Sequence, residues 1–221
     1  MPEYQIKTED VEYLRHGDRR LVARLYKPQG DGPFPAVVDL HGGAWNNGDL
    51  SGTQGLDESL ARNGFVVASL EFRHAGDGYP TSLVDINYAI RWLKAHAREL
   101  KVDPNRVGSG GASSGGHLAM LAAMRPNDPR YASAPLPAGS PKVDASVRAV
   151  AMSCPVINPL SRYRNAQKAA KTPNPQAFSI GMKEKHDLYW KTEAAMAEGN
   201  PMLMLERGEK VTMPAALWVQ G

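Results

Sequence analysis

The chain has 221 residues, a length at which one domain can bury a substantial core. Its residues are 42% hydrophobic and 22% charged, which is typical of a globular protein and excludes a disordered or fibrous one. The formal net charge is +3, and the lysines and arginines are scattered rather than clustered, which predicts that the protein does not bind nucleic acid.

No segment has the apolar core of a signal peptide, and no run is long enough to span a bilayer, which predicts no membrane association. The single cysteine, Cys154, cannot form an internal disulfide, and we expect it to be a small buried residue. Together these features predict a cytoplasmic protein.

Short apolar runs recur along the chain and indicate strands. Residues 4–26 are expected to form two strands around the turn His16-Gly17-Asp18. Continuous apolar runs are typical of strands covered on both faces, and they occur at residues 36–40, 65–72, 106–112, 147–153 and 214–219. Strands that alternate with helices predict an α/β fold with a mostly parallel central sheet, helices on both faces and an N-terminal antiparallel hairpin.

Helical periodicity is clearest between Leu83 and Leu100, where Ser82 and Asp85 fit a capping box and Asp103-Pro104 should end the helix. Residues 114–124 predict a second helix, rich in small residues.

Residues 155–211 have a less regular pattern, with a helix expected at 183–198. We interpret this segment as a cap or lid insertion within a single domain that comprises residues 1–221.

The strongest motif is Gly111-Ala112-Ser113-Ser114-Gly115, which matches G-x-S-x-G. A serine nucleophile on a sharp strand-to-helix turn needs glycines two positions before and after it, because side chains there would clash. The motif follows a predicted strand and opens a predicted helix. Ser113 is therefore the candidate nucleophile.

A second motif, His41-Gly42-Gly43-Ala44-Trp45, lies about 70 residues upstream at the end of another predicted strand. Glycines in such a turn let backbone N–H groups approach an oxygen that becomes negative during acyl transfer. We expect the N–H groups of Gly43 and Ala44, with that of Ser114, to form an oxyanion hole.

With these motifs the sequence resembles the α/β-hydrolase serine esterases of the hormone-sensitive-lipase and bacterial feruloyl-esterase-like kind. The resemblance implies an α/β-hydrolase fold, a carboxylesterase without a cofactor, and Ser113 as nucleophile with Gly43, Ala44 and Ser114 as oxyanion donors. Because Ala44 stands where the lipases have a third glycine, the feruloyl-esterase-like members are the nearer relatives. The resemblance runs from about Pro35 to the end and also rests on Phe72-Arg73, Pro80, Asp85, Asp103 to Val107, and Gly111 to Leu118.

The family order places the catalytic acid just after the strand predicted at 214–219, and the histidine later still. The sequence ends at Gly221. We therefore expect a longer protein of roughly 280 residues, whose remaining segment is supplied by the same protein or by another chain. The oligomeric state stays open.

Other candidate residues have simpler interpretations. His117 is expected to be a buried, hydrogen-bonded residue and His41 to brace the oxyanion turn, whereas His74 and His186 should face solvent. No spacing of histidines and carboxylates predicts a metal site. Trp45, Tyr163 and Trp190 could line a substrate pocket, although core packing explains each equally well.

The favoured function is hydrolysis of short-chain or aromatic-acid esters, with a small-molecule ester as substrate and an acyl-enzyme formed on Ser113. One alternative is an amidase or peptidase of the same fold, of the formamidase or aminopeptidase type. Another is a non-catalytic protein of this fold that binds a ligand or partner.

Overall fold

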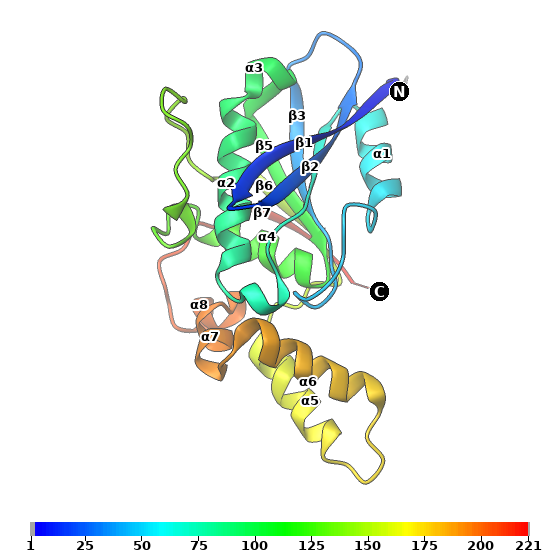
Figure 1. Ribbon diagram of the computed structural model, residues 1–221, viewed down its shortest axis with the longest axis vertical. Coiled ribbons are helices and arrows are strands. Elements are labelled where there is room, and N and C mark those ends of the chain that lie inside the picture. Colours follow the sequence, from blue (N-terminus) through cyan, green and yellow to red (C-terminus); the bar gives the residue numbers. More distant parts are fainter. Residues whose placement is uncertain (1–2, 221) are drawn as a thin grey trace.

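The computed structural model describes residues 3–220 and is built around a sheet of seven strands (Figure 1). The strand order is β1-β2-β4-β3-β5-β6-β7, in which β1, β2 and β4 are antiparallel neighbours and all later pairs are parallel. The predicted mostly parallel sheet with an N-terminal antiparallel hairpin is confirmed. The strands are β1 Ile6–His16, β2 Arg19–Pro28, β3 Phe34–Leu40, β4 Val66–Leu70, β5 Val102–Ala112, β6 Ala149–Ser153 and β7 Ala215–Val219.

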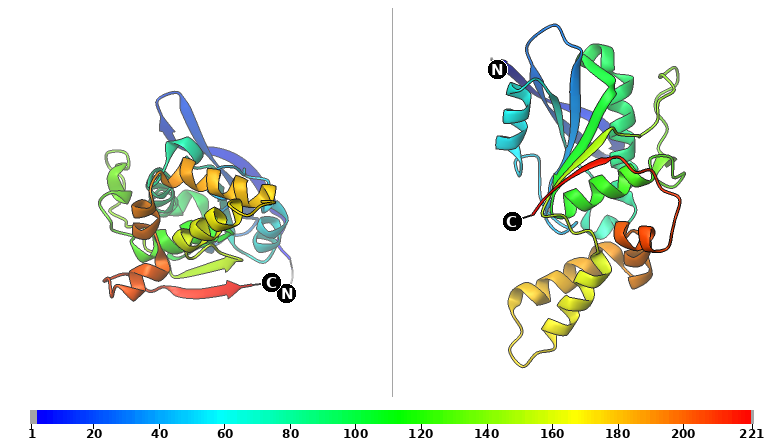
Figure 2. Two further views of the ribbon diagram at one scale, coloured as in Figure 1. Left: turned by 90° about the horizontal axis from the view of Figure 1, so that it is seen from below. Right: turned by 180° about the vertical axis from the view of Figure 1, so that it is seen from behind.

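Helices cover both faces of this sheet (Figures 1 and 2). Neighbouring strand residues point to opposite faces, so Tyr26 and Val67 pack against Ala61 of α1, while Leu25 and Ala68 belong to the larger core that includes α2 and α4. The helices are α1 Gln54–Arg62, α2 Thr81–Ala95, α3 Ala97–Leu100, α4 Ser114–Met124, α5 Pro159–Ala170, α6 Ala177–Trp190, α7 Glu193–Glu198 and α8 Pro201–Glu206.

The capping box predicted at the start of α2 is wrong. The helix begins after Pro80, and no side chain caps it. Ser82 instead donates its hydroxyl hydrogen to the carbonyl of Arg73, and Asp85 accepts from the Arg73 backbone N–H and guanidinium, both at 2.8 Å. His16 Nε2 lies 2.9 Å from the same carboxylate. Both residues therefore tie α2 to the chain before it rather than cap it.

The end of this region also differs from the prediction. The helix expected to reach Leu100 is interrupted at His96 and continues as the short α3. Strand β5 begins at Val102, so Asp103-Pro104 lies inside a strand instead of ending a helix.

Residues 155–211 contain four helices, of which α5 and α6 form an antiparallel pair that projects from the rest of the molecule (Figure 1). The helix predicted at 183–198 is two helices, because Lys191 adopts a left-handed φ of 66° between α6 and α7. That this segment acts as a cap stays a prediction.

An open groove of about 850 Å³ is lined by residues of α1, β3, β5, β6 and β7. Its walls are mostly apolar and include Leu56 and Leu60 of α1 and Leu217 and Val219 of β7. Every residue of β7 is exposed. The last strand of the order therefore forms an uncovered sheet edge.

Candidate active site

Ser113 occupies the turn between β5 and α4, at the carboxyl end of the sheet. Its backbone has φ 53° and ψ −116°, a strained conformation for a residue with a side chain. The neighbouring strand holds it there, because the Ser113 N–H donates to the Ser153 carbonyl at 2.8 Å and the Ser113 carbonyl accepts from Val156 N–H at 3.1 Å. The side chain is half-buried at the head of α4. The role of Ser113 as nucleophile stays a prediction.

The glycines around Ser113 are required by close backbone packing. A Cβ at Gly115 would lie 2.0 Å from the Leu40 carbonyl oxygen, and one at Gly111 would lie 2.6 Å from the Gly115 carbonyl carbon. The start of α4 is therefore pressed against the end of β3 with no room for side chains. This contact brings the residues that follow β3 next to Ser113.

The turn after β3, called the oxyanion turn below after its predicted role, lies against the Ser113 turn. A Cβ at Gly42 would lie 3.4 Å from the Ser113 Cβ, so the two segments touch. Gly43, Ala44 and Trp45 have φ of 111°, 54° and 63°, three consecutive left-handed residues. Gly43 tolerates no side chain, because its Cβ would lie 1.7 Å from the Asn47 carbonyl oxygen. The structure thus brings Gly43 and Ala44 to the end of the sheet that carries Ser113 and Ser114.

His41 lies beneath this turn and contacts it as expected. It is buried, its Nδ1 donates to the Gly42 carbonyl at 2.8 Å, and its ring stacks on Phe72 at 4.4 Å between centroids. Burial lowers the pKa of His41, which keeps the ring neutral at pH 7. A neutral imidazole protonated on Nδ1 suits a structural contact to a carbonyl.

No histidine within residues 3–220 hydrogen-bonds to Ser113. His16 pairs with Asp85, His96 with the Trp92 carbonyl, His117 with Trp45 and Gly199, and His186 with the Met182 carbonyl. In the same part of the chain, no group of three or more His, Cys, Asp or Glu residues could hold a metal ion. Among the described helices, none combines the length and apolar character needed to cross a membrane.

Two expectations about single residues are wrong. His186, predicted to face solvent, is buried on the inner side of α6 with its ring 5.1 Å from that of Trp45. Cys154, predicted to be buried, is exposed just after β6, where its φ is 45°.

The three aromatic residues proposed to line a substrate pocket are mostly in the core. Trp45 and Trp190 are each 1% exposed and pack against one another at 5.3 Å, nearly perpendicular. Tyr163 is 8% exposed and donates its hydroxyl hydrogen to Asp187 at 2.7 Å. Contact of these side chains with a substrate stays a prediction.

Asn46 is a residue of the site that sequence reasoning missed. Its amide donates to the Ala44 carbonyl at 2.6 Å and to the Lys185 carbonyl of α6 at 2.8 Å, so it fastens the oxyanion turn to the projecting helices. The available signal was the Asn46-Asn47-Gly48 run after the glycines, since asparagine side chains often hydrogen-bond to backbone in turns.

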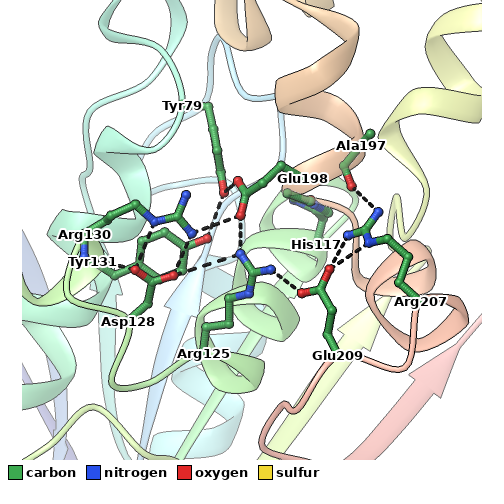
Figure 3. Close-up of polar contacts among 11 residues, drawn as sticks. Tyr79, His117, Arg125, Asp128, Arg130, Tyr131, Ala197, Glu198, Arg207 and Glu209 are labelled. Atoms are coloured by element: carbon green, nitrogen blue, oxygen red, sulfur yellow. Dashed lines mark hydrogen bonds and ion pairs between the residues drawn. The ribbon is translucent and has the colours of Figure 1, made fainter.

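A charged network joins the end of α4 to the last residue of α7 and to the segment after α8 (Figure 3). Arg125 binds the carboxylates of both Glu198 and Glu209, and Arg130 lies 2.9 Å from Glu198. Tyr79 donates its hydroxyl hydrogen to Glu198, so the Tyr131 hydroxyl, 2.8 Å away, donates to Tyr79. The Glu198 carboxylate is thus held from three sides.

Comparisons with known proteins show which family and which fold the chain shares. A family model described as BD-FAE matches residues 24–210. The probable carboxylic ester hydrolase LipM of Mycobacterium tuberculosis is 34% identical over 126 residues, which are 55% of this chain and 29% of LipM. In fold, the chain is similar to Esterase B from Lactobacillus rhamnosis, with a TM-score of 0.74, 24% identity and coverage of 98% of this chain and 65% of that one.

The carboxylesterase EstE1, cloned from a metagenomic library, has a TM-score of 0.70 at 22% identity, with 99% of this chain and 80% of EstE1 covered. These neighbours confirm the predicted α/β-hydrolase fold. The chain spans less than a third of the length of LipM and about two thirds of that of Esterase B.

Proposed function

The chain belongs to the BD-FAE family and has the α/β-hydrolase fold, and from this we propose that the protein hydrolyses carboxylic esters through an acyl-enzyme on Ser113. The observation that carries the proposal is the contact between the strained Ser113 turn and the left-handed Gly43–Trp45 turn. Either turn alone is a local backbone feature. Their contact supports a site in which the Ser113 hydroxyl and the backbone N–H groups of the second turn act together.

In the proposed reaction, Ser113 Oγ attacks the ester carbonyl carbon, and the carbonyl oxygen gains negative charge. The N–H groups of Gly43, Ala44 and Ser114 donate hydrogen bonds to that oxygen, which lowers the barrier because they are oriented before the reaction begins. The alcohol leaves, and water then attacks the acyl-enzyme to release the acid and restore Ser113. A histidine held by a carboxylate is the base that the family order implies; it takes the serine proton and returns it to the leaving alcohol.

For substrates we propose short-chain or aromatic-acid esters. The open end of the site is bordered by helices whose surface is charged, with ion pairs between Lys183 and Asp187 and between Arg164 and Glu193. An amidase or peptidase of the same fold remains the alternative chemistry. Turnover of p-nitrophenyl acetate, N-formylkynurenine and a prolyl anilide separates these activities.

The central test is Ser113→Ala. We expect kcat for p-nitrophenyl acetate to fall at least about 10³-fold, the scale seen when a triad member is removed. The matched control is Ser59→Ala, which removes an exposed hydroxyl on α1 far from the turn and should leave kcat unchanged. Near-normal turnover by Ser113→Ala would refute the assignment.

A fluorophosphonate probe separates an enzyme from a non-catalytic binding protein. We expect covalent labelling of the wild-type protein at one site and none of Ser113→Ala. A wild-type protein that stays unlabelled, although folded, would favour the binding protein.

A further inference from the structure

His117 lies on the first turn of α4, four residues after Ser113, and is completely buried. The indole Nε1–H of Trp45 donates to its Nδ1 at 3.2 Å. Its Nε2 lies 2.8 Å from the carbonyl oxygen of Gly199, in the segment between α7 and α8. One side chain therefore bridges the oxyanion turn and the helices after β6.

The two partners fix which nitrogen carries the proton. An indole N–H can only donate, so Nδ1 must be unprotonated, and a carbonyl can only accept, so Nε2 must carry the hydrogen. Only the neutral imidazole protonated on Nε2 makes both bonds. Burial lowers the pKa of His117 to about 4, which keeps that form present at neutral pH.

Trp45 needs such a partner because it ends the strained stretch of the oxyanion turn. Consecutive left-handed residues persist only where the surrounding structure holds them. The ring of Trp45 packs against Trp190, Tyr189 and His186, and such ring contacts are less directional than a hydrogen bond. The directional contact of its side chain is the hydrogen bond to His117.

Gly199 is a fixed anchor for the other end of the bridge. Its preceding residue, Glu198, is held by Arg125, Arg130 and Tyr79 (Figure 3). A Cβ at Gly199 would lie 2.7 Å from the Trp190 ring, so the backbone passes in close contact with that ring. The carbonyl that His117 meets therefore has little freedom to move.

We propose that His117 is a positioning residue for the oxyanion hole. Its ring links the Trp45 indole to the Gly199 carbonyl and thereby sets where the N–H groups of Gly43 and Ala44 lie relative to Ser113. This inference rests on the proposed hydrolysis at Ser113. His117 does not touch the substrate. It acts through Trp45, so its removal changes the stabilisation of the developing oxyanion more than the binding of the ester.

Two substitutions separate the two arms of the bridge. In His117→Asn the amide oxygen can stand near the former Nδ1 and accept from Trp45, whereas in His117→Gln the amide nitrogen can stand near the former Nε2 and donate to Gly199. We expect His117→Asn to keep kcat within about 3-fold of wild type. We expect His117→Gln to lower kcat about 10- to 100-fold, less than the 10²–10³ for outright loss of an oxyanion donor, with KM changed less than about 3-fold.

Trp45→Phe is the second variant, because it keeps a buried ring but removes the indole N–H. Trp45→Phe should lower kcat as much as His117→Gln. The double variant should have the same kcat as either single variant, because both substitutions remove the same hydrogen bond between Trp45 and His117. Thermal unfolding of each variant is measured in parallel.

Equal kcat for His117→Asn and His117→Gln, or additive losses in the double variant, would overturn the positioning role. A purely structural role would lower the Tm of both His117 variants without separating their kcat values. Failure of the proposed function is distinguishable, since it shows as ester turnover that survives Ser113→Ala, whatever the His117 variants do.

Discussion

Among single residues, Asp39 and Asp57 form an unusual pair of buried carboxylates between β3 and α1. The Thr53 hydroxyl lies 2.5 Å from Asp39 Oδ2 and 3.3 Å from Asp57 Oδ2, so it lies between the two acids. Burial, together with the nearby charge of Asp39, raises the pKa of Asp57 to about 7. The folded protein therefore holds a proton on Asp57 that the unfolded chain releases near pH 4.

This proton predicts how stability changes with pH. Because the pKa of Asp57 is higher in the folded protein, the stability that its proton contributes is fully present below the unfolded pKa and is lost as pH rises toward 7. The free energy of unfolding should therefore fall between pH 4 and pH 7. Asp57→Asn cannot titrate and should remove a decline on the order of 2 kcal/mol between pH 5 and pH 8. Urea unfolding at both pH values measures the effect, with Glu58→Gln as the control for a lost charge. A decline as steep in Asp57→Asn as in wild type contradicts the prediction.

Gly115 provides a second test at the residue scale. Its absent side chain is what lets α4 approach the Leu40 carbonyl, and Gly115→Ala should cost at least about 2 kcal/mol of stability, with loss of ester turnover. The matched control is Gly181→Ala on α6, where an added Cβ meets nothing within 4 Å. Alanine there should be neutral or stabilise by up to about 1 kcal/mol. Thermal unfolding compares the two, and similar Tm values would count against the packing argument.

At the scale of elements, most strands and α4 were predictable from sequence, because apolar runs and small-residue periodicity are local signals. Helices α5 and α8 were missed although each begins with Asn-Pro, where Asn158 and Asn200 cap the helix through Ser161 N–H and Leu203 N–H at 2.9 and 3.0 Å. Their apolar faces are too short to show periodicity. The failed capping box at α2 has the opposite cause, since Ser82 and Asp85 match a local pattern but bind distant partners.

The network around Arg125 is the feature that no local signal could give, because its members come from positions 79 to 209. We expect Arg125→Met to destabilise the protein by about 1–3 kcal/mol, since two partly buried carboxylates lose their shared partner.

Arg164→Met is the matched control for Arg125→Met, because its pair with Glu193 is exposed on both sides. It should cost less than about 1 kcal/mol. Urea unfolding gives the free energies, and limited proteolysis should cut the Arg125 variant faster between α7 and β7. Equal costs for the two substitutions would show that the network adds no more than a surface pair.

For the whole molecule, the charged helices that border the site predict its preference for substrate. Exposed apolar residues such as Phe178 and Leu188 on α6 are interspersed with Lys183, Glu184 and Lys185, so α6 offers no continuous apolar face for a long acyl chain. We expect kcat/KM for p-nitrophenyl esters to be highest from acetate to butyrate. A steady rise from butyrate to palmitate would contradict this.

The site as a whole was predictable only in part. The two glycine motifs identify the Ser113 and Gly43 turns because the close backbone packing at each turn leaves no room for a side chain, so only glycine fits there. The tethers of those turns, Asn46 to Lys185 and His117 to Gly199, join segments separated by 139 and 82 positions, and no spacing rule connects them.

The uncovered edge at β7 contains a tryptophan whose fluorescence reports on its exposure to solvent. Of the four tryptophans, Trp45, Trp92 and Trp190 are at most 8% exposed, whereas Trp218 on β7 is 52% exposed. Iodide in solution should therefore quench the emission of Trp218 and little else, and Trp218→Phe should remove the quenchable fraction. Any segment or partner that covers β7 would then shift the emission of Trp218 to shorter wavelength and reduce its quenching by iodide. Both changes can be measured on the intact protein without a label.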